Sequence, residues 1–219
     1  MMLAGPLALA MLAGAATVRV ARDLGRGRRP PSGAVVGVAA LAVYAAGIRP
    51  RIRSWGASPE EARMPLPGDE FVPDSVMQTT RAVTIAAPPA DVWPWLAQIG
   101  QERGGFYSYE WLENLAGCRM RNAEEIHPEW QHRDPGEAIL LHPAARLEVN
   151  LFEPGRAFGI EGWGVFVLEP IGRGHTRLLV RGRCPRRLAM AAYSILLEIP
   201  HFLMERKMLL GIRERAERR

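Results

Sequence analysis

The residues of this chain best suited to acid–base chemistry lie close together near its C-terminal end: Glu198, His201 and Glu205. A helix places His201 and Glu205 on one face at i and i+4, and a histidine beside a carboxylate is a common acid–base pair. The alternative is a satisfied structural pair, or a histidine that simply follows a kink at Pro200. Glu198 is flanked by the apolar segments ILL and IPHF. Its carboxylate therefore needs an arginine partner or a raised pKa, unless it faces water at the kink.

Four polar residues lie in segments that have the alternating pattern of strands. On the concave face of a sheet they would fix the polar end of a ligand, and Glu148 would be a third candidate acid–base group. A solvated outer face is the alternative, because one wet face produces the same alternation. These residues are Glu148, Asn150, Arg177 and Arg181.

Aromatic side chains are concentrated in the middle of the chain, especially in the stretch RGGFYSYEWLENLAG. Rings of this kind line cavities for apolar ligands, but they are equally ordinary core material. A short helix would place Tyr107 and Trp111 on one face at i and i+4, toward the ligand, with Tyr109 pointing elsewhere. The full set is Trp93, Trp95, Phe106, Tyr107, Tyr109, Trp111, Trp130 and Trp163.

The sequence lacks the patterns of several other kinds of site. There is no serine nucleophile elbow, no phosphate-binding glycine loop and no spacing of His and Cys typical of zinc, so we expect neither a metal nor a cofactor. HPEWQH separates His127 and His132 by five positions, which fits no ligand motif. Cys118 and Cys184 are too few for a disulfide framework and are expected to be unpaired structural thiols.

The net charge of +5 is unevenly distributed along the 219 residues. Residues 1–53 contain eight arginines and one aspartate and carry +7, which leaves −2 for residues 54–219. A nucleic-acid surface needs clustered basic residues on the folded domain itself. We therefore expect no nucleic-acid partner.

Two uncharged runs, Met1–Val18 and Pro30–Ile48, have about the length that crosses a hydrocarbon core. The arginines follow the first run instead of preceding it, which disfavours a cleaved signal peptide. We predict a transmembrane hairpin in residues 1–53 and a membrane as partner. Five arginines lie between the runs and three follow the second, so the side of the main domain stays open.

The remaining chain changes its periodicity in an informative order. Residues 54–78 are rich in proline and predict a tether, and the domain is expected over 79–219. A strand at Thr79–Ala87 and the helix PPADVWPWLAQIG precede five strand-like segments punctuated by turn signals. A long helix from about Arg187 to Glu217 closes the chain, and its frequent charges argue against another span.

This order resembles the helix-grip fold of the START-like superfamily of polyketide cyclases/dehydrases and lipid-transport proteins (SRPBCC). The resemblance rests on TRAVTIAAPPADVWPWLAQIG, GGFYSYEWLENLAG, LFEPGRAFGI, WGVFVLEP, GHTRLLVRGR and LLEIPHFLMERKMLLGIRERAE. The second and last stretches are similar to a narrower, membrane-anchored actinobacterial-type subgroup. The resemblance implies an α+β fold, with a curved antiparallel sheet wrapped on the C-terminal helix and a cavity between them.

The first hypothesis is therefore membrane-tethered binding of a small hydrophobic ligand, such as a lipid, an isoprenoid or a polyketide-like compound. An enzyme of the cyclase/dehydratase or hydrolase kind, using Glu148, Glu198 or His201, is the second. A structural module of a membrane complex is the third. The expected ligand contacts are Trp95, Phe106, Tyr107, Trp111, Trp130, Glu148, Trp163, Arg181 and His201.

Overall fold

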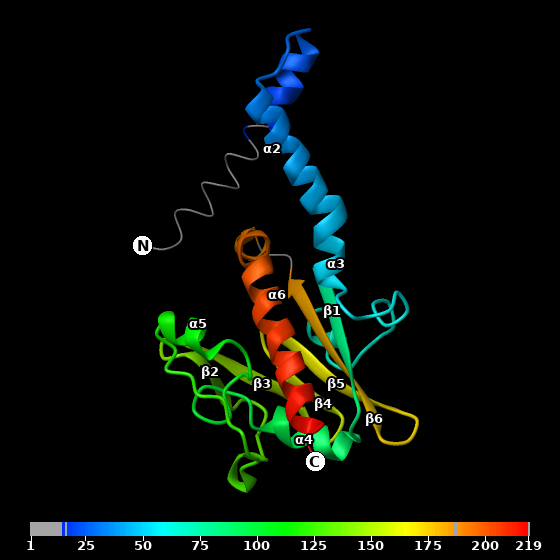
Figure 1. The fold of residues 1–219 in the computed structure, drawn as a ribbon, viewed down its shortest axis with the longest axis vertical. Helices are drawn as coiled ribbons and strands as arrows, with labels where there is room; N and C mark the ends of the chain where they lie inside the picture. Colours follow the sequence, from blue (N-terminus) through cyan, green and yellow to red (C-terminus); the bar gives the residue numbers. More distant parts are fainter. Residues whose placement is uncertain (1–14, 16, 186–187, 219) are drawn as a thin grey trace.

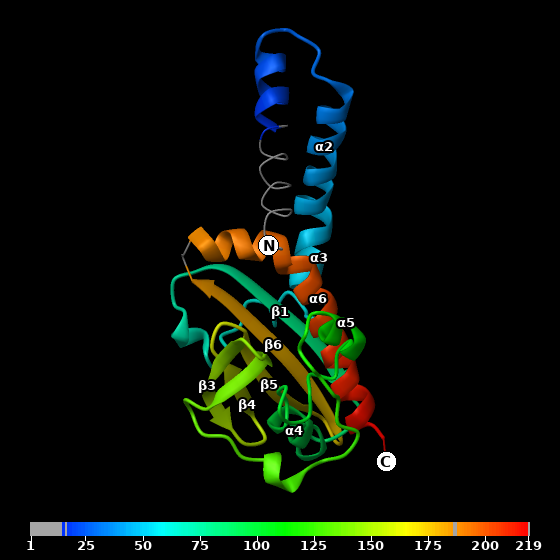
Figure 2. The same ribbon diagram turned by 90° about the vertical axis from the view of Figure 1, so that its left-hand side faces the viewer.

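The computed structural model describes residues 15, 17–185 and 188–218, and its centre is one antiparallel sheet packed against a long C-terminal helix (Figures 1 and 2). The sheet has six strands in the order β1-β6-β5-β4-β3-β2. The strands are β1 (Ser75–Ile85), β2 (Ala138–His142), β3 (Ala145–Glu153), β4 (Ala157–Ile160), β5 (Gly164–Ile171) and β6 (His175–Pro185). The prediction of an α+β fold with a helix-grip-like arrangement is confirmed at this level.

The strands β2 to β6 form the predicted meander, in which each strand pairs with the next along the chain. The turn signal EPG accounts for one connection, because Gly155 has a φ of +77° and glycine adopts this left-handed conformation without strain. The first strand β1 then pairs with the last strand β6 over nearly its whole length. Strand β1 is therefore an edge of the sheet, held by the sequence-distant β6, and the N-terminal helix is attached beside it (Figure 2).

Three helices pack on or beside the sheet: α4 (Pro89–Ala97), α5 (Glu110–Leu115) and α6 (Leu188–Ala216). The helix α4 begins with a proline at its first position, as predicted from PPADVW. The helix α6 crosses one face of the sheet, and Pro200 lies within it. Short 3₁₀ turns are formed by η2 (Asp69–Phe71) and η3 (Pro128–Trp130).

The main core lies between the sheet, α4 and the C-terminal part of α6. Val92 and Leu96 of α4 and Leu209 and Ile212 of α6 are fully buried there, together with rings such as Phe158. Burying one side chain of this size contributes roughly 2 kcal/mol. The alternation of apolar residues along the strands is what turns this face of the sheet toward α6.

The opposite face of the sheet is covered by the segment predicted as a tether. Leu66 is buried there against apolar side chains of the sheet, and the backbone N–H of Ala82 donates to the carbonyl of Trp55 over 3.0 Å. The first strand also begins at Ser75, before the predicted domain start at Thr79. Residues 57–69 thus form a layer on the outer face of the sheet.

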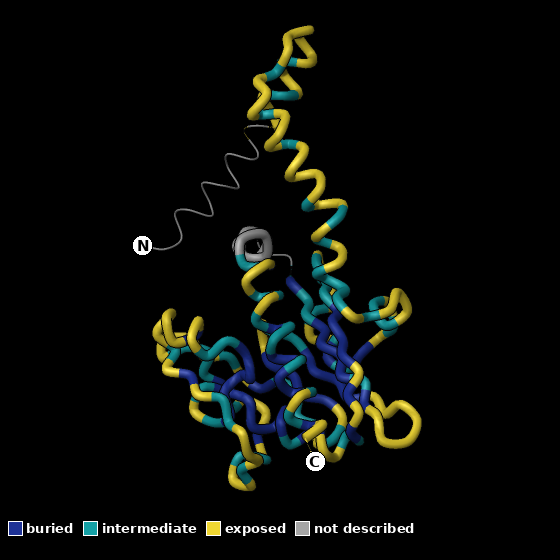
Figure 3. Tube along the Cα trace, viewed as in Figure 1, coloured by how far each residue is buried: buried dark blue, intermediate teal, exposed yellow. Residues whose placement is uncertain are grey.

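The described part of the N-terminal region contains one helix long and apolar enough to cross a membrane, Ser32–Arg53. It comprises α2 (Ser32–Val43), a π-helical turn η1 (Tyr44–Ile48) and α3 (Arg49–Arg53). It projects from the sheet and is exposed (Figure 3). The predicted hairpin of two spans is corrected to this one apolar helix. Most of the first predicted span, Met1–Val18, lies outside the described residues.

One expectation about strand faces is wrong because of a β-bulge. The alternation predicts Leu147, Val149 and Leu151 on one face, but the register of β3 against β4 shifts between Val149 and Leu151. A bulge inserts one extra residue, here Asn150, and so reverses the faces beyond it. Leu151 therefore packs on the outer face, whereas Phe152 joins the main core.

Candidate functional site

A cavity of about 290 Å³ lies between α5 with the loop after it, the strands β2 and β3, and the middle of α6. Most of its wall is apolar, and the polar groups are few. This composition is typical of sites for small apolar molecules. The lining residues are Phe106, Ser108, Glu113, Met120, Leu141, Leu147, Gly162, Trp163, His201, Met204, Glu205 and Met208.

The most strongly held polar group of the wall is the carboxylate of Glu205 on α6. Arg81 of β1 contacts its Oε1 at 2.6 Å, and the indole N–H of Trp163 donates to its Oε2 over 3.0 Å. His201 lies one turn earlier, with Nε2 at 3.2 Å from Oε2. Burial alone would raise the pKa of Glu205, but the charge of Arg81 and the bond to His201 outweigh it and lower the pKa to about 2. Glu205 is therefore a fixed anion with its oxygens occupied.

A second carboxyl group, that of Glu113 on α5, lines the same cavity. Its residue is 8% exposed. The buried Oε2 has no hydrogen-bond partner in the described part of the chain. Burial, with a smaller contribution from the neighbouring Glu110, raises the pKa of Glu113 to about 7. From the sequence alone, Glu113 is predicted only as an acidic residue that favours a helix N-terminus. Its place on the cavity wall was therefore missed.

Three of the predicted ligand contacts lie on the cavity wall: Phe106, Trp163 and His201. The rings of Phe106 and Trp163 are 5.2 Å apart between centroids, and Trp163 is 6.0 Å from His201. Trp163 and His201 also line a second, smaller cavity of about 70 Å³, which extends under α6 toward Glu198. These two side chains therefore stand between the two cavities.

Two other predicted contacts, Trp95 and Tyr107, are core residues. They meet edge to face with their centroids 5.8 Å apart, and Gln98 donates to the Tyr107 hydroxyl over 3.0 Å. Burial raises the pKa of Tyr107 well above its usual value. Tyr107 has a φ of +53° and precedes α5, which begins at Glu110. It is therefore not one helical turn from Trp111, and the predicted shared face does not exist.

Trp111 lies on the outer side of α5 and is 68% exposed, so the expectation that it faces the ligand is corrected. Trp130 lies in η3, where its ring stacks on His127 at 4.0 Å between centroids, away from the cavity. A six-residue helix has one inner face, and in α5 this face carries Glu113 instead of the tryptophan.

The two polar strand residues among the predicted contacts also lie elsewhere. Glu148 is exposed on β3. Arg181 is buried on the outer face of the sheet, where it pairs with Asp69 at 2.8 Å and donates to the carbonyl of Glu61 at 2.7 Å. Its role is to fasten residues 61–69 to the sheet. Glu148 therefore lies on a solvated face, and Arg181 has a structural role.

Glu198 has the arginine partners that its apolar surroundings require. Its carboxylate receives Arg49 Nε at 2.7 Å, Arg53 Nε at 2.6 Å and the hydroxyl of Tyr44 at 2.8 Å. Burial would raise the pKa of Glu198, but the hydrogen bonds from these three groups lower it. Glu198 therefore joins α6 to the N-terminal helix, and it is not available as an acid–base group.

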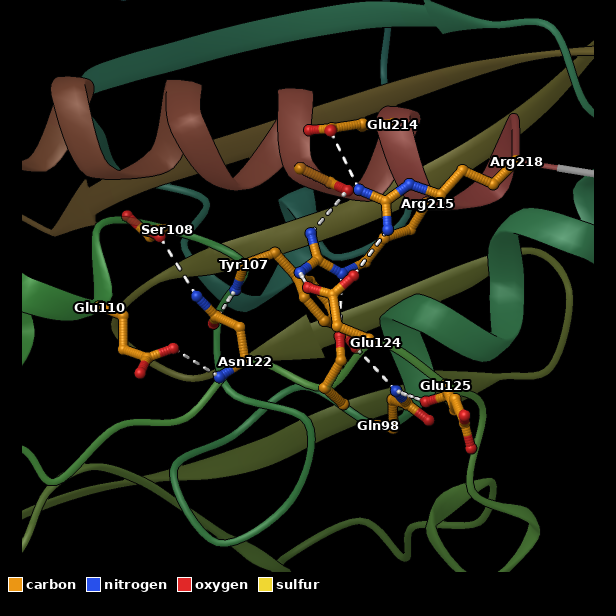
Figure 4. A network of polar contacts seen from close by, with 12 residues as sticks. Gln98, Tyr107, Ser108, Glu110, Asn122, Glu124, Glu125, Glu214, Arg215 and Arg218 are labelled. Carbon is orange, nitrogen blue, oxygen red and sulfur yellow. Dashed lines mark hydrogen bonds and ion pairs between the residues drawn. The ribbon is translucent and has the colours of Figure 1, made fainter.

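The C-terminal end of α6 holds the segments before and after α5, which contribute to the cavity wall (Figure 4). Arg215 lies over the ring of Tyr107 at 4.8 Å from its centroid and donates to the carbonyl of Ala123 over 2.9 Å. Arg215 and Arg218 both pair with Glu124. The side chain of Asn122 accepts from the N–H of Tyr107 over 2.7 Å. These contacts fix the approach to α5 and hence the position of Glu113.

The described residues contain no cluster of three or more His, Cys, Asp or Glu side chains that would hold a metal ion. Cys118 and Cys184 are free thiols. Among the described residues, the polar groups of the cavity wall are thus the Glu205 network, Glu113 and the hydroxyl of Ser108.

Comparison with known proteins gives distant structural similarity. No family model and no curated sequence matches the chain. It is similar to protein MLL2253 from Mesorhizobium loti, with 16% identity, 63% of this chain and 98% of that chain covered, and a TM-score of 0.33. It is also similar to TTHA0849 from Thermus thermophilus (13% identity, 64% and 97% covered, TM-score 0.33). CalU16 from Micromonospora echinospora is a third such structure (14%, 64% and 83%, TM-score 0.29).

Proposed function

We propose that this chain binds a small hydrophobic molecule, such as a lipid, an isoprenoid or a polyketide-like compound, in the cavity between α5, the sheet and α6. The observation that carries the proposal is the largely apolar cavity of about 290 Å³. An engineered apolar cavity of about 150 Å³ already holds benzene. The volume here lies near the lower end of natural ligand sites, which begin at about 300 Å³.

Three methionines in the wall support a cavity that adapts to its contents. Met120, Met204 and Met208 all contribute to the lining, and the unbranched thioether chain repacks at low cost. A ligand somewhat larger than the cavity can therefore be accommodated by rotamer changes of these side chains.

The N-terminal helix Ser32–Arg53 is proposed to anchor the domain in a membrane. Its exposure and apolar length support this role. The small cavity beside Glu198 lies where this helix joins the domain. An apolar ligand is concentrated in the bilayer, so a site next to the anchor receives it over a short path.

Native mass spectrometry of the full-length chain, released from lipid nanodiscs, tests the proposal. We expect an additional mass from a bound hydrophobic molecule that organic extraction removes. An empty chain that also takes up no lipid, isoprenoid or polyketide-like compound from a panel would contradict the proposal.

A cavity-filling variant tells this site from binding elsewhere. Leu147 is half-buried in the wall, so Leu147→Trp should occupy the space and abolish the additional mass. Leu112→Trp is the matched control, because Leu112 lies on α5 outside the cavity and is 39% exposed. Equal loss in both variants, or in neither, would place the molecule elsewhere.

An enzyme with acid–base chemistry is the second candidate, and a specific observation favours it. Glu113 and His201, two titratable groups, line one cavity, and two such groups in one pocket are a first requirement of such a reaction. Incubation of the extracted molecule with stoichiometric protein tests this candidate. A mass change of the molecule that disappears in Glu113→Gln supports it, whereas an unchanged mass favours simple binding.

A further inference from the structure

Two carboxyl groups line the described cavity, and that of Glu113 is the one without a hydrogen-bond partner among the described residues. It is 8% exposed, and its Oε2 is fully buried without a hydrogen bond. The other carboxylate of the wall, Glu205, is engaged by Arg81, Trp163 and His201. A buried polar group without a partner costs free energy, and the cost is higher when the group is charged. The cost is removed when a ligand supplies the missing partner.

The groups around Glu113 supply no positive charge to it. On α5 its charged neighbour is Glu110, whose Oε2 accepts from the N–H of Asn122 over 3.1 Å. Cys118 follows α5, and burial, with a smaller contribution from the negative charge of Glu113, raises the pKa of that thiol. No lysine or arginine lines the described cavity, and the walls from β2 and β3 are leucines.

The remaining titratable groups belong to α6 and β2. His201 and Glu205 line the cavity on the α6 side, where they pair with each other. His142 at the end of β2 has its Nε2 3.5 Å from where a Cβ on Gly117 would lie. The cavity therefore offers hydrogen-bond acceptors in excess of donors, and its uncompensated charge is negative when Glu113 ionises.

We propose that Glu113 anchors the head group of the ligand, and that this ligand is an apolar molecule ending in a hydrogen-bond donor, with an amine preferred over a carboxylic acid. The inference rests on the proposed function and names the ligand class for the same cavity. An ammonium group inside this apolar wall gains a charge-assisted hydrogen bond from the carboxylate. A carboxylate ligand would face the like charge of Glu113, and no lysine or arginine lines the described cavity to offset it.

The pH dependence of binding follows from the same geometry. The pKa of Glu113 is about 7 in the free protein. Below that pH an ammonium ligand must displace the proton, so amine affinity rises as the pH increases through 7 and then levels off. A neutral alcohol bonds to either form of the carboxyl group, so its affinity changes much less over this range.

The test measures binding of octylamine, octanol and octanoate to the full-length chain in lipid nanodiscs by equilibrium dialysis. Uptake by empty nanodiscs is subtracted at the same lipid concentration, and the pH is varied from about 6 to about 8, on either side of the pKa of Glu113. At the upper end of this range we expect octylamine to bind most tightly and octanoate most weakly. Glu113→Gln should weaken octylamine at least about 10-fold, change octanol little, and abolish the rise of amine affinity with pH.

Glu110→Gln is the matched control, because it removes a carboxylate from the same helix and leaves Glu113 in the cavity. It should retain the preference for the amine. Thermal melts of both variants check that they fold. Octanoate binding as tightly as octylamine, or amine binding indifferent to Glu113→Gln, would overturn the inference while leaving the cavity a binding site. If no probe binds above empty nanodiscs, the inference falls together with the proposed function.

Discussion

At the residue scale, the carboxylate of Glu205 joins three separated parts of the chain: Arg81 of β1, Trp163 between β4 and β5, and His201 of α6. Arg81 and Glu205 are 1% and 3% exposed in their side chains. Removal of one partner from such a pair leaves a buried charge uncompensated, which is more costly than the loss of the pair.

Arg81→Met is therefore expected to lower the free energy of unfolding by about 3–5 kcal/mol. Arg156→Met is the control, because Arg156 pairs with Glu153 at 2.8 Å but is 65% exposed, and such pairs contribute about 1 kcal/mol or less. Urea denaturation measures both. Similar losses of unfolding free energy in the two variants would show that the buried pair stabilises the fold no more than an exposed pair does.

The raised pKa of Glu113 predicts a distinct pH dependence of stability. The folded protein holds the proton up to about pH 7, whereas the unfolded chain releases it near the ordinary carboxyl value of 4.5. Stability falls as pH rises between these values, because the folded state binds more protons than the unfolded state there. Glu113→Gln should remove this fall and be more stable at about pH 8 by up to about 3 kcal/mol. Melting curves at about pH 4 and about pH 8, which bracket the two pKa values, check this. A Glu113→Gln variant less stable than the wild type at the higher pH would contradict it.

The sequence predicted some of these residue roles and missed others for a physical reason. The pairing of His201 with Glu205 follows from their i, i+4 spacing, and it is present at 3.2 Å. The need of Glu198 for arginine partners follows from its apolar neighbours. The exposure of Trp111 and the burial of Glu113 depend instead on how the short α5 is rotated by the loop before it. That rotation is set by contacts distant in sequence, such as those of Arg215.

At the element scale, α6 approaches the loop before α5 so closely that only glycine fits at one position. A Cβ on Gly211 would lie 2.4 Å from the carbonyl oxygen of Tyr107 and 2.9 Å from its Cβ. The backbone of Tyr107 is itself in the left-handed region, so it has little freedom to move away.

Gly211→Ala should therefore destabilise the domain by roughly 1–3 kcal/mol, although alanine favours helices. Gly37→Ala is the control, since Gly37 lies in α2 with nothing within 4 Å of an added Cβ. Thermal denaturation compares them. A Gly211→Ala protein as stable as the wild type would mean that the helix and loop are not in this close contact.

The junction between α3 and α6 predicts a second effect at this scale. Glu198→Gln keeps the size of the side chain but removes the charge that pairs with Arg49 and Arg53. We expect faster amide hydrogen exchange over residues 49–55, measured by mass spectrometry. Glu214→Gln, on the same helix but in an exposed pair with Arg218, should leave this exchange unchanged. Identical exchange in both variants would contradict a coupling of the two helices through Glu198.

The strands show where sequence patterns are sufficient and where they are not. Alternation and turn signals predicted all six strands and the antiparallel meander of the last five, but not the pairing of β1 with β6. They did not predict the bulge at Asn150, because an extra residue in one strand leaves alternation intact on either side. Gly159 on β4 allows it, since a Cβ there would lie 2.3 Å from Asn150 Oδ1.

At the scale of the whole molecule, a helix-grip-like domain is joined to one exposed apolar helix (Figure 1). Composition predicted the apolar N-terminus, and the order of elements predicted the sheet with its C-terminal helix. The sequence did not predict that residues 57–69, within the predicted tether, cover the outer face, because prolines and charges in the tether region are typical of a linker. Arg181 and Arg177 explain the difference, since they hold this segment through Asp69 and Glu61.

Whether the cavity beside Glu113 and Trp163 holds a hydrophobic ligand is tested most directly by an experimental density map of the full-length chain purified from membranes. We predict continuous non-protein density in the cavity, with its polar end at the carboxyl group of Glu113 and its apolar part against Phe106, Trp163 and Met208. A cavity filled by the chain's own methionines, or by water alone, would contradict the claim.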